Sequence, residues 1–179
     1  MHKLKKILIV LLVVFSLPLI IALFIKKDFI VEREIVIMKP KTEVFNYIKM
    51  IRNQDHFSKW NLTDPNMKKT SKGIDGTVGF VAMWDSENEN LGKGEQEIVA
   101  VFEGEKIETK LRFIEPFEAE HDAYMITEAI SESKTKVKWG FKGGFPYPMN
   151  LMGLFIDMDK EIGKDFEVGL ENLKNILEK

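Results

Sequence analysis

The chain contains no cysteine among its 179 residues. This absence excludes disulfides, thiolate metal sites, a cysteine nucleophile and the acylated cysteine of a lipoprotein. Histidine is scarce too: beyond the N-terminal tip only His56 and His121 occur, and no HxxxH or HxxE spacing is present. Folding would have to bring two such ligands together, so we expect no bound metal and no cofactor.

Other catalytic patterns are also missing. No serine stands in a nucleophile-elbow sequence, so nothing indicates an activated serine. Acidic residues are abundant, but most fall on the polar faces of predicted elements, and no carboxylate pair is singled out for acid–base chemistry. Gly92 and Gly94 flank a single lysine, which is too short for a phosphate-binding loop and typical of a strand entry or bulge. The sequence therefore predicts no catalytic residue.

Negative charge is absent from the first 27 residues, which hold five of the 26 basic side chains. Residues 28–179 are left with 21 basic and 28 acidic side chains. Because an acidic domain repels phosphate backbones, nucleic acid is not an expected partner. The contrast divides the chain into an N-terminal anchor over residues 1–27, with lysine flanks, and a domain over residues 28–179.

An uncharged apolar stretch occupies residues 7–25, where only Ser16 and Pro18 are not large aliphatic or aromatic residues or alanine. As a helix it would span about 28 Å, close to the hydrocarbon core of a bilayer. We expect a single-pass transmembrane helix. The alternative is a cleaved signal peptide, which has a shorter apolar part and a small-x-small cleavage site. Three lysines before the stretch and two after it favour the extracytoplasmic side for the domain.

The C-terminal stretch has the period of an amphipathic helix. We expect about 24 helical residues, in which Gly163 and Gly169 each cost about 1 kcal/mol of helix propensity. Glycines kept at that cost indicate close packing against a flat surface, most simply a sheet. The apolar face consists of Phe155, Met158, Ile162, Phe166, Leu170, Leu173 and Leu177.

Between these two helices the apolar residues change from helical spacing to alternation. Residues 41–51 predict a short helix, and residues 53–60 predict a further helical turn. Strands are predicted over residues 29–38, 77–84, 93–102, 105–114, 119–130 and 134–141. Their inward faces would carry Val78, Phe80, Ala82 and Trp84; Ile98, Ala100 and Phe102; Ile107, Thr109, Leu111 and Phe113; Tyr124, Ile126 and Ile130; and Thr135, Val137, Trp139 and Phe141.

One dry face and short connections indicate an antiparallel meander. The dry face must be covered, and only the C-terminal helix is long enough to cover it. The predicted fold class is α+β: a curved antiparallel sheet wrapped around a long C-terminal helix, preceded by one transmembrane helix.

This order of elements resembles the helix-grip fold, also called START-like or Bet v 1-like. The local sequence is similar to the polyketide cyclase/dehydrase and lipid-transport branch of that superfamily, often labelled SRPBCC. The motifs are KTEVFNYI ahead of HFSKWN, then GIDGTVGF, TKVKWGFKG and IGKDFEVGLENLKNILEK. The resemblance implies a cavity between sheet and helix that binds an apolar ligand. It implies no catalytic residues, because the family shares no single set.

A cavity of this kind would be lined by dry strand faces and the near side of the C-terminal helix, with Trp60 and Tyr147 near its rim. Aromatic rings and methionines suit an apolar ligand of loose shape, whereas an ordinary filled core would use the same residues. The loop over residues 143–150 is either a gate or a plain connector. The candidate wall residues are Phe80, Trp84, Leu111, Phe113, Tyr124, Trp139, Phe141, Met152, Phe155 and Met158.

The leading interpretation is a membrane-anchored, non-catalytic domain that binds an apolar small molecule or lipid. One alternative is a cyclase or dehydratase, which needs an ionisable group inside the pocket; His56, Glu97 or His121 would point inward if the strand registers were shifted by one residue. Another is a module that docks a protein at the membrane.

Overall fold

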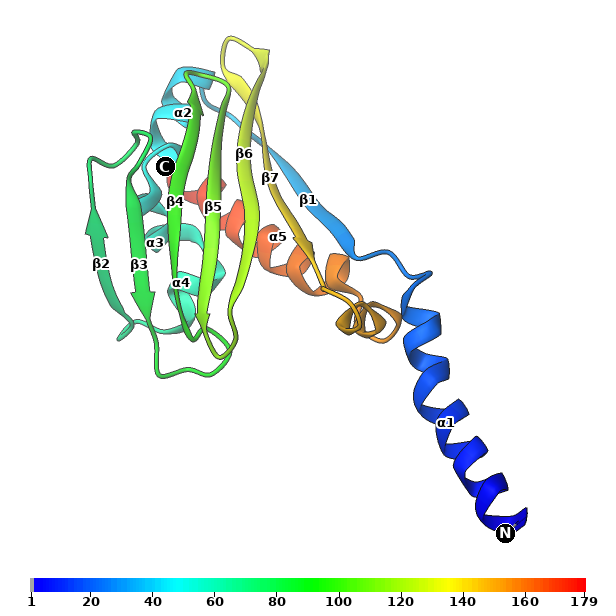
Figure 1. Ribbon diagram of the computed structural model, residues 1–179. Helices are drawn as coiled ribbons and strands as arrows, with labels where there is room; N and C mark the ends of the chain where they lie inside the picture. Colours follow the sequence, from blue (N-terminus) through cyan, green and yellow to red (C-terminus); the bar gives the residue numbers. More distant parts are fainter. Residues whose placement is uncertain (1) are drawn as a thin grey trace.

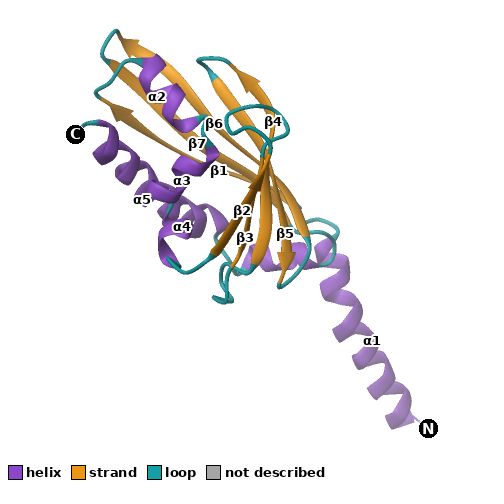
Figure 2. Cartoon of the chain, turned by 90° about the vertical axis from the view of Figure 1, so that its left-hand side faces the viewer, coloured by secondary structure: helices purple, strands orange, loops and turns teal. Residues whose placement is uncertain are grey.

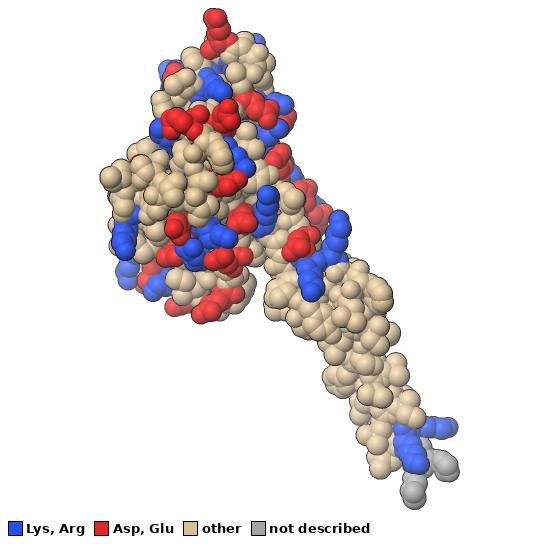
Figure 3. Space-filling view, turned by 45° about the horizontal axis from the view of Figure 1, so that its top comes forward, with Lys and Arg blue, Asp and Glu red and all other residues tan. Residues whose placement is uncertain are grey.

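The N-terminal helix projects from the remainder of the chain and contacts it at its C-terminal end (Figure 1). The computed structural model describes residues 2–179, and its first element is α1 (His2–Ala22). By length and composition this one helix is able to cross a membrane, a property that signal sequences share. Figure 3 shows its shaft without charged side chains between the lysines near its start and the charged surface of the domain.

The remaining elements follow α1 in chain order. They are β1 (Asp28–Ile37), α2 (Lys41–Ile48), η1 (Ile51–Asn53), α3 (Gln54–Phe57), α4 (Lys59–Thr63), β2 (Lys68–Lys72), β3 (Val81–Asp85), β4 (Lys93–Phe102), β5 (Lys106–Glu115), β6 (Ala119–Ser131), β7 (Lys134–Gly144), η2 (Met149–Leu154) and α5 (Met158–Leu177), where η denotes a 3₁₀ helix.

The strands form one antiparallel sheet of seven, in the order β1-β7-β6-β5-β4-β3-β2. Figure 2 shows α3, α4 and α5 on one side of this sheet. The core lies between them and is built from side chains such as Val31, Phe57, Met125, Phe166 and Leu173. The predicted curved antiparallel sheet with a long C-terminal helix is confirmed.

The C-terminal helix starts later than predicted. It begins at Met158, where the side chain of Asp157 accepts a hydrogen bond from the backbone N–H of Lys160 at 3.1 Å and so caps the first turn. Phe155 ends the preceding η2 turn and does not lie on the apolar face of α5. The two glycines pack as expected: a Cβ at Gly163 would meet the Arg33 guanidinium, and one at Gly169 would meet the Trp139 ring.

The strand predicted over residues 77–84 was too long. β3 begins at Val81, because residues 73–80 form turns in which Gly76 and Gly79 have φ of +79° and +86°. Val78 is exposed as a result. β2 was not predicted, because its five residues are all exposed and show no apolar alternation.

Two predicted strand faces were wrong. A register shift between Ile98 and Ala100 turns Ala100 and Phe102 outward, so Val101 packs on the core instead. In β6 the inward residues are Ala123, Met125 and Thr127, which are buried opposite Phe141, Trp139 and Val137 of β7. Tyr124, Ile126 and Ile130 therefore belong to the outer face.

Candidate functional site

A row of aromatic side chains crosses the helix-facing side of the sheet near the end where α1 joins β1. Ring centroids are separated by 5.9 Å between Trp84 and Phe113, 6.0 Å between Phe113 and His121, and 5.1 Å between His121 and Phe141. The row continues through Phe29, 6.1 Å from Phe141, to Phe145, 5.7 Å further on. We call these six residues the aromatic row.

Strand pairing explains why the row is continuous. Gly94 lies directly between Trp84 and Phe113 in the register, and a Cβ there would be 2.4 Å from the Trp84 ring. Gly143 gives Phe29 and Phe141 the same room. The absence of a side chain at each glycine lets the rings lie flat over the neighbouring strand.

The row is only partly covered. Phe141 is buried, whereas the other members are half-buried. Two open hollows of about 500 and 510 Å³ lie at its β1 end, and Phe29 and Phe145 line both. The first reaches His121 but is lined mainly by outer-face groups of the sheet, among them Lys110, Asp122 and Lys142; the second reaches Ile25, Phe155 and Met158. Through the second hollow, the Phe29 end of the row therefore opens onto apolar side chains beside the exit of α1.

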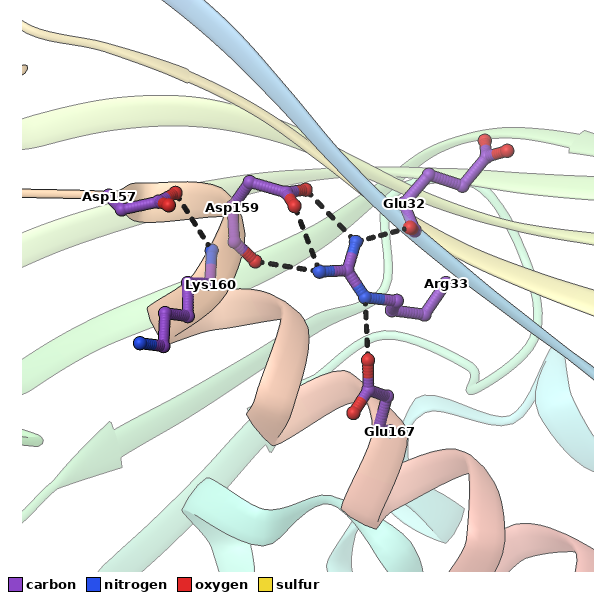
Figure 4. Close-up of polar contacts among 6 residues, drawn as sticks. All are labelled: Glu32, Arg33, Asp157, Asp159, Lys160 and Glu167. Carbon is purple, nitrogen blue, oxygen red and sulfur yellow. Dashed lines mark hydrogen bonds and ion pairs between the residues drawn. The ribbon is translucent and has the colours of Figure 1, made fainter.

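An ion-pair cluster determines where α5 lies relative to this surface. The Arg33 guanidinium on β1 donates to both carboxylate oxygens of Asp159, at 2.9 and 3.0 Å, and to Glu167 at 2.8 Å (Figure 4). These bonds raise the pKa of Arg33 and lower the pKa of Asp159. The cluster ties the start of α5 to β1, and the helix packs over β1 and β7, whereas Trp84 on β3 and Phe113 on β5 stay half-buried.

His121 is the titratable member of the row. Its ring lies between Phe113 and Phe141, and burial lowers its pKa below the usual 6.5. The neutral imidazole is therefore favoured at pH 7. Among the residues that the structure describes, no cluster of three histidine or carboxylate side chains is placed to hold a metal ion.

Comparison with solved structures identifies the architecture. A protein of Nitrosospira multiformis superposes with a TM-score of 0.58 at 16% identity, covering 83% of this chain and 96% of the other. Norcoclaurine synthase from Thalictrum flavum gives 0.61 at 8% identity, covering 84% and 86%. The chain has the helix-grip, or Bet v 1-like, fold.

At these sequence identities, the structural similarity shows the fold and nothing about activity. The Aha1 dimer structure from Colwellia psychrerythraea also superposes, with a TM-score of 0.56 at 12% identity, covering 84% of this chain and 96% of that one. No known family model matches the chain, and no curated protein matches it. Helix-grip neighbours thus include a synthase and a dimeric Aha1, so the chemistry of this chain has to be argued from its own site.

Five of the predicted wall residues lie in or beside the aromatic row and its hollows. Trp84, Phe113 and Phe141 belong to the aromatic row, Leu111 is half-buried beside it, and Met158 lines the second hollow.

Three others are packed into the core. The Trp139 ring stacks on Phe166 with centroids 4.7 Å apart, and Trp60 meets both rings edge-on. Phe80 is fully buried under the Arg52 guanidinium. The Trp60, Trp139 and Phe166 rings therefore fill the space between α5 and β7, and the open surface lies nearer to α1.

Tyr124 was assigned to the wrong face. Its hydroxyl donates to Glu32 at 2.6 Å on the outer side of the sheet, and its ring fills the space over Gly140. Burial and this hydrogen bond raise its pKa to about 12. Outward placement follows from the missing side chain at Gly140, which leaves room for a ring on that face.

The last three predicted residues lie around η2, next to α1. Tyr147 donates to the carbonyl of Leu19, Met152 is exposed in η2, and Phe155 is 86% exposed. Sequence reasoning missed Phe29 and Phe145 and named His121 only as an off-register possibility. The signals that could have found them are Gly143, whose missing side chain leaves room for the Phe29 and Phe141 rings, and the Ala123–Met125–Thr127 alternation.

Proposed function

We propose that residues 28–179 bind an apolar small molecule or lipid on the aromatic row, without catalysis, while residues 1–27 anchor the domain in a membrane. The observation that carries this proposal is the half-buried row of rings opening beside α1. Exposed aromatic surface of this extent costs free energy in water, and an apolar ligand that covers it recovers about 25 cal/mol for each Å² removed from water. A tether places such a site next to a supply of lipid.

The ligand can be sought directly in the full chain. We would purify it in lipid nanodiscs, record native mass spectra, and repeat them after organic extraction. A discrete extra mass that extraction removes supports the proposal and identifies the ligand class. A bare polypeptide that also takes up no added fatty acid or phospholipid would contradict it.

A matched pair of variants tests where the ligand sits. Phe113→Ala removes a ring from the row, and loss of its buried surface should weaken binding of a fluorescent fatty acid roughly tenfold. Phe102→Ala removes a half-exposed ring from the opposite end of the sheet and should leave the affinity unchanged. Equal effects of the two variants would argue against the aromatic row as the site.

His121 supports a second candidate, an enzyme acting on an apolar substrate. A neutral imidazole held between two phenyl rings is able to accept a proton from a bound molecule. His121→Gln tests this candidate through turnover: an enzyme that uses the imidazole as a base would lose turnover in this variant, whereas a binding domain shows no turnover even in the unaltered chain.

We further propose that the domain lies on the extracytoplasmic side, since three lysines precede the apolar stretch and two follow it. Because the chain has no cysteine, the variant Phe102→Cys would carry a single thiol, located on the domain. It should react with a membrane-impermeant maleimide in intact cells, and protection of that thiol would place the domain inside.

A further inference from the structure

The segment between β7 and α5 is unusual for a chain with 30% charged residues: residues 145–156 contain none. Most of its apolar side chains are exposed rather than packed. They are Tyr147, Met149, Met152, Leu154, Phe155 and Ile156. Apolar surface of this density on one short segment marks a contact site and not chance exposure.

The segment is fastened to the end of α1 by hydrogen bonds. The Asn150 side-chain amide donates to the carbonyls of Ala22 at 2.7 Å and Ile25 at 2.9 Å, and the Tyr147 hydroxyl donates to that of Leu19 at 3.3 Å. Asn150 is 1% exposed and Ala22 is fully buried. Figure 1 shows the coil before α5 lying against the upper end of α1.

These contacts determine the depth of the segment relative to α1. Leu19 lies three residues before Ala22, which is about 4.5 Å further along the helix axis toward its N-terminus. Both residues belong to the uncharged stretch 7–25. When that stretch crosses a bilayer, a side chain bonded to the Leu19 carbonyl lies at or below the boundary between headgroups and hydrocarbon.

We propose that residues 147–156 form a second membrane-binding element, which lies in the interface of the same bilayer beside α1. The inference rests on the proposed membrane anchor. Tyrosine and phenylalanine are suited to this depth, and Lys26 and Lys27, which follow α1, meet the lipid phosphates. We infer that lipid covers this segment, because hydrogen bonds hold the segment against the end of α1. Whatever covers it must therefore lie at the same depth in the bilayer as that end of the helix.

The geometry gives this element a role for the site. Leu154 and Phe155 line the second hollow together with Phe29 and Phe145, which are the end members of the aromatic row. With residues 147–156 in the interface, this hollow faces lipid and not water. An apolar ligand then reaches the row from the bilayer without an aqueous step.

The cysteine-free sequence allows a direct depth measurement on the full chain. Single-cysteine variants at Phe155, Val13 and Phe102 would carry a nitroxide in vesicles of phosphatidylcholine and phosphatidylglycerol. Val13 is in the shaft of α1, and Phe102, at the opposite end of the sheet, is as exposed as Val13, at 51%. Power saturation compares collisions with oxygen, which concentrates in lipid, and with a water-soluble nickel complex.

We expect the labels at 155 and 13 to collide more with oxygen than with nickel, and the label at 102 to show the reverse. A label at 155 as nickel-accessible as the one at 102, with 13 still in lipid, would overturn this inference and leave the anchor intact. A label at 13 in water would overturn the anchor as well. A label at 155 could instead be shielded from both reagents and show spin–spin broadening that disappears when unlabelled chain is added. That result would overturn the inference and assign the surface to contact with a second copy of the chain.

Discussion

The side-chain amide of Asn150 donates a 2.7 Å hydrogen bond to the carbonyl of Ala22, which lies 128 residues earlier in the chain. The last carbonyls of a helix have no partner within it, and here one is satisfied by the coil that precedes the C-terminal helix. The same amide also bonds to Ile25. One buried side chain thus couples the orientation of the N-terminal helix to the open end of the aromatic row.

Replacing Asn150 should loosen this junction. Asn150→Leu keeps the volume and removes both hydrogen bonds, a loss of about 1–3 kcal/mol that leaves two carbonyls unsatisfied. Trypsin cleavage after Lys26 or Lys27 should accelerate roughly tenfold. Asn172→Leu is the control, because its amide bonds to Phe57 inside the domain. An unchanged cleavage rate in Asn150→Leu would show that the junction does not depend on this amide.

His121 should make the domain sensitive to mild acid. Burial lowers its folded pKa below 6.5, so the folded state disfavours the imidazolium. The resulting stability is complete above pH 6.5 and is lost as the pH falls from there through the folded pKa. His121→Phe keeps a ring in the row and should flatten this part of the stability curve. Titration of the imidazole C2 proton by NMR checks the cause, and a midpoint at or above 6.5 would refute it.

Tyr124 should ionise well above an ordinary tyrosine. Its pKa is raised to about 12 from 10.0 by burial and by the bond to Glu32. The linked stability is complete below pH 10 and is lost as the pH rises through 12. Absorbance at 295 nm should show one of the three tyrosines titrating near 12, and Tyr124→Phe should abolish that step. If the step survives in the variant, it belongs to another tyrosine.

Gly169→Ala should destabilise the domain although alanine favours helix. A Cβ at 169 would lie 2.7 Å from the Trp139 ring, and that ring is held by its stack on Phe166. Overpacking of about 1–3 kcal/mol outweighs a helix gain of about 1 kcal/mol, for a net loss of about 1 kcal/mol. Denaturant titration measures it. Gly153→Ala has open space around its Cβ and should be neutral; equal results would dismiss the close-packing explanation.

Strands with one clean apolar face could be predicted from the sequence, and β5 and β7 are the clearest cases. The inward side chains Ile107 and Thr109 of β5, and Thr135, Val137, Trp139 and Phe141 of β7, are buried at every second position, as their sequences predicted. β2 could not be predicted, because it is an exposed polar strand that exists through its pairing with β3. Phe102 was misplaced by a bulge, whose position depends on the partner strand and not on the local sequence.

The inward face of β6, which contributes His121 to the aromatic row, could not be predicted from the sequence either. Tyr124 and Ile126 point outward, whereas Ala123 and Met125 point inward and are buried. Because both faces of the strand carry apolar residues, their alternation alone did not distinguish the inward face from the outward one. The orientation is decided by Gly140 on the neighbouring strand, which makes room for Tyr124 on the outside and so turns His121 toward the aromatic row.

The sequence by itself determined the apolar N-terminal helix, the antiparallel sheet and the long amphipathic helix that covers it, because each depends on periodicity along a few consecutive residues. Only the tertiary structure decided which rings form the aromatic row, and that residues 147–156 lie against α1. Those features depend on strand register, on glycines that admit a neighbouring ring, and on Asn150 bonding across 128 residues. Contacts between distant segments leave no period in the sequence, so only the folded chain shows them.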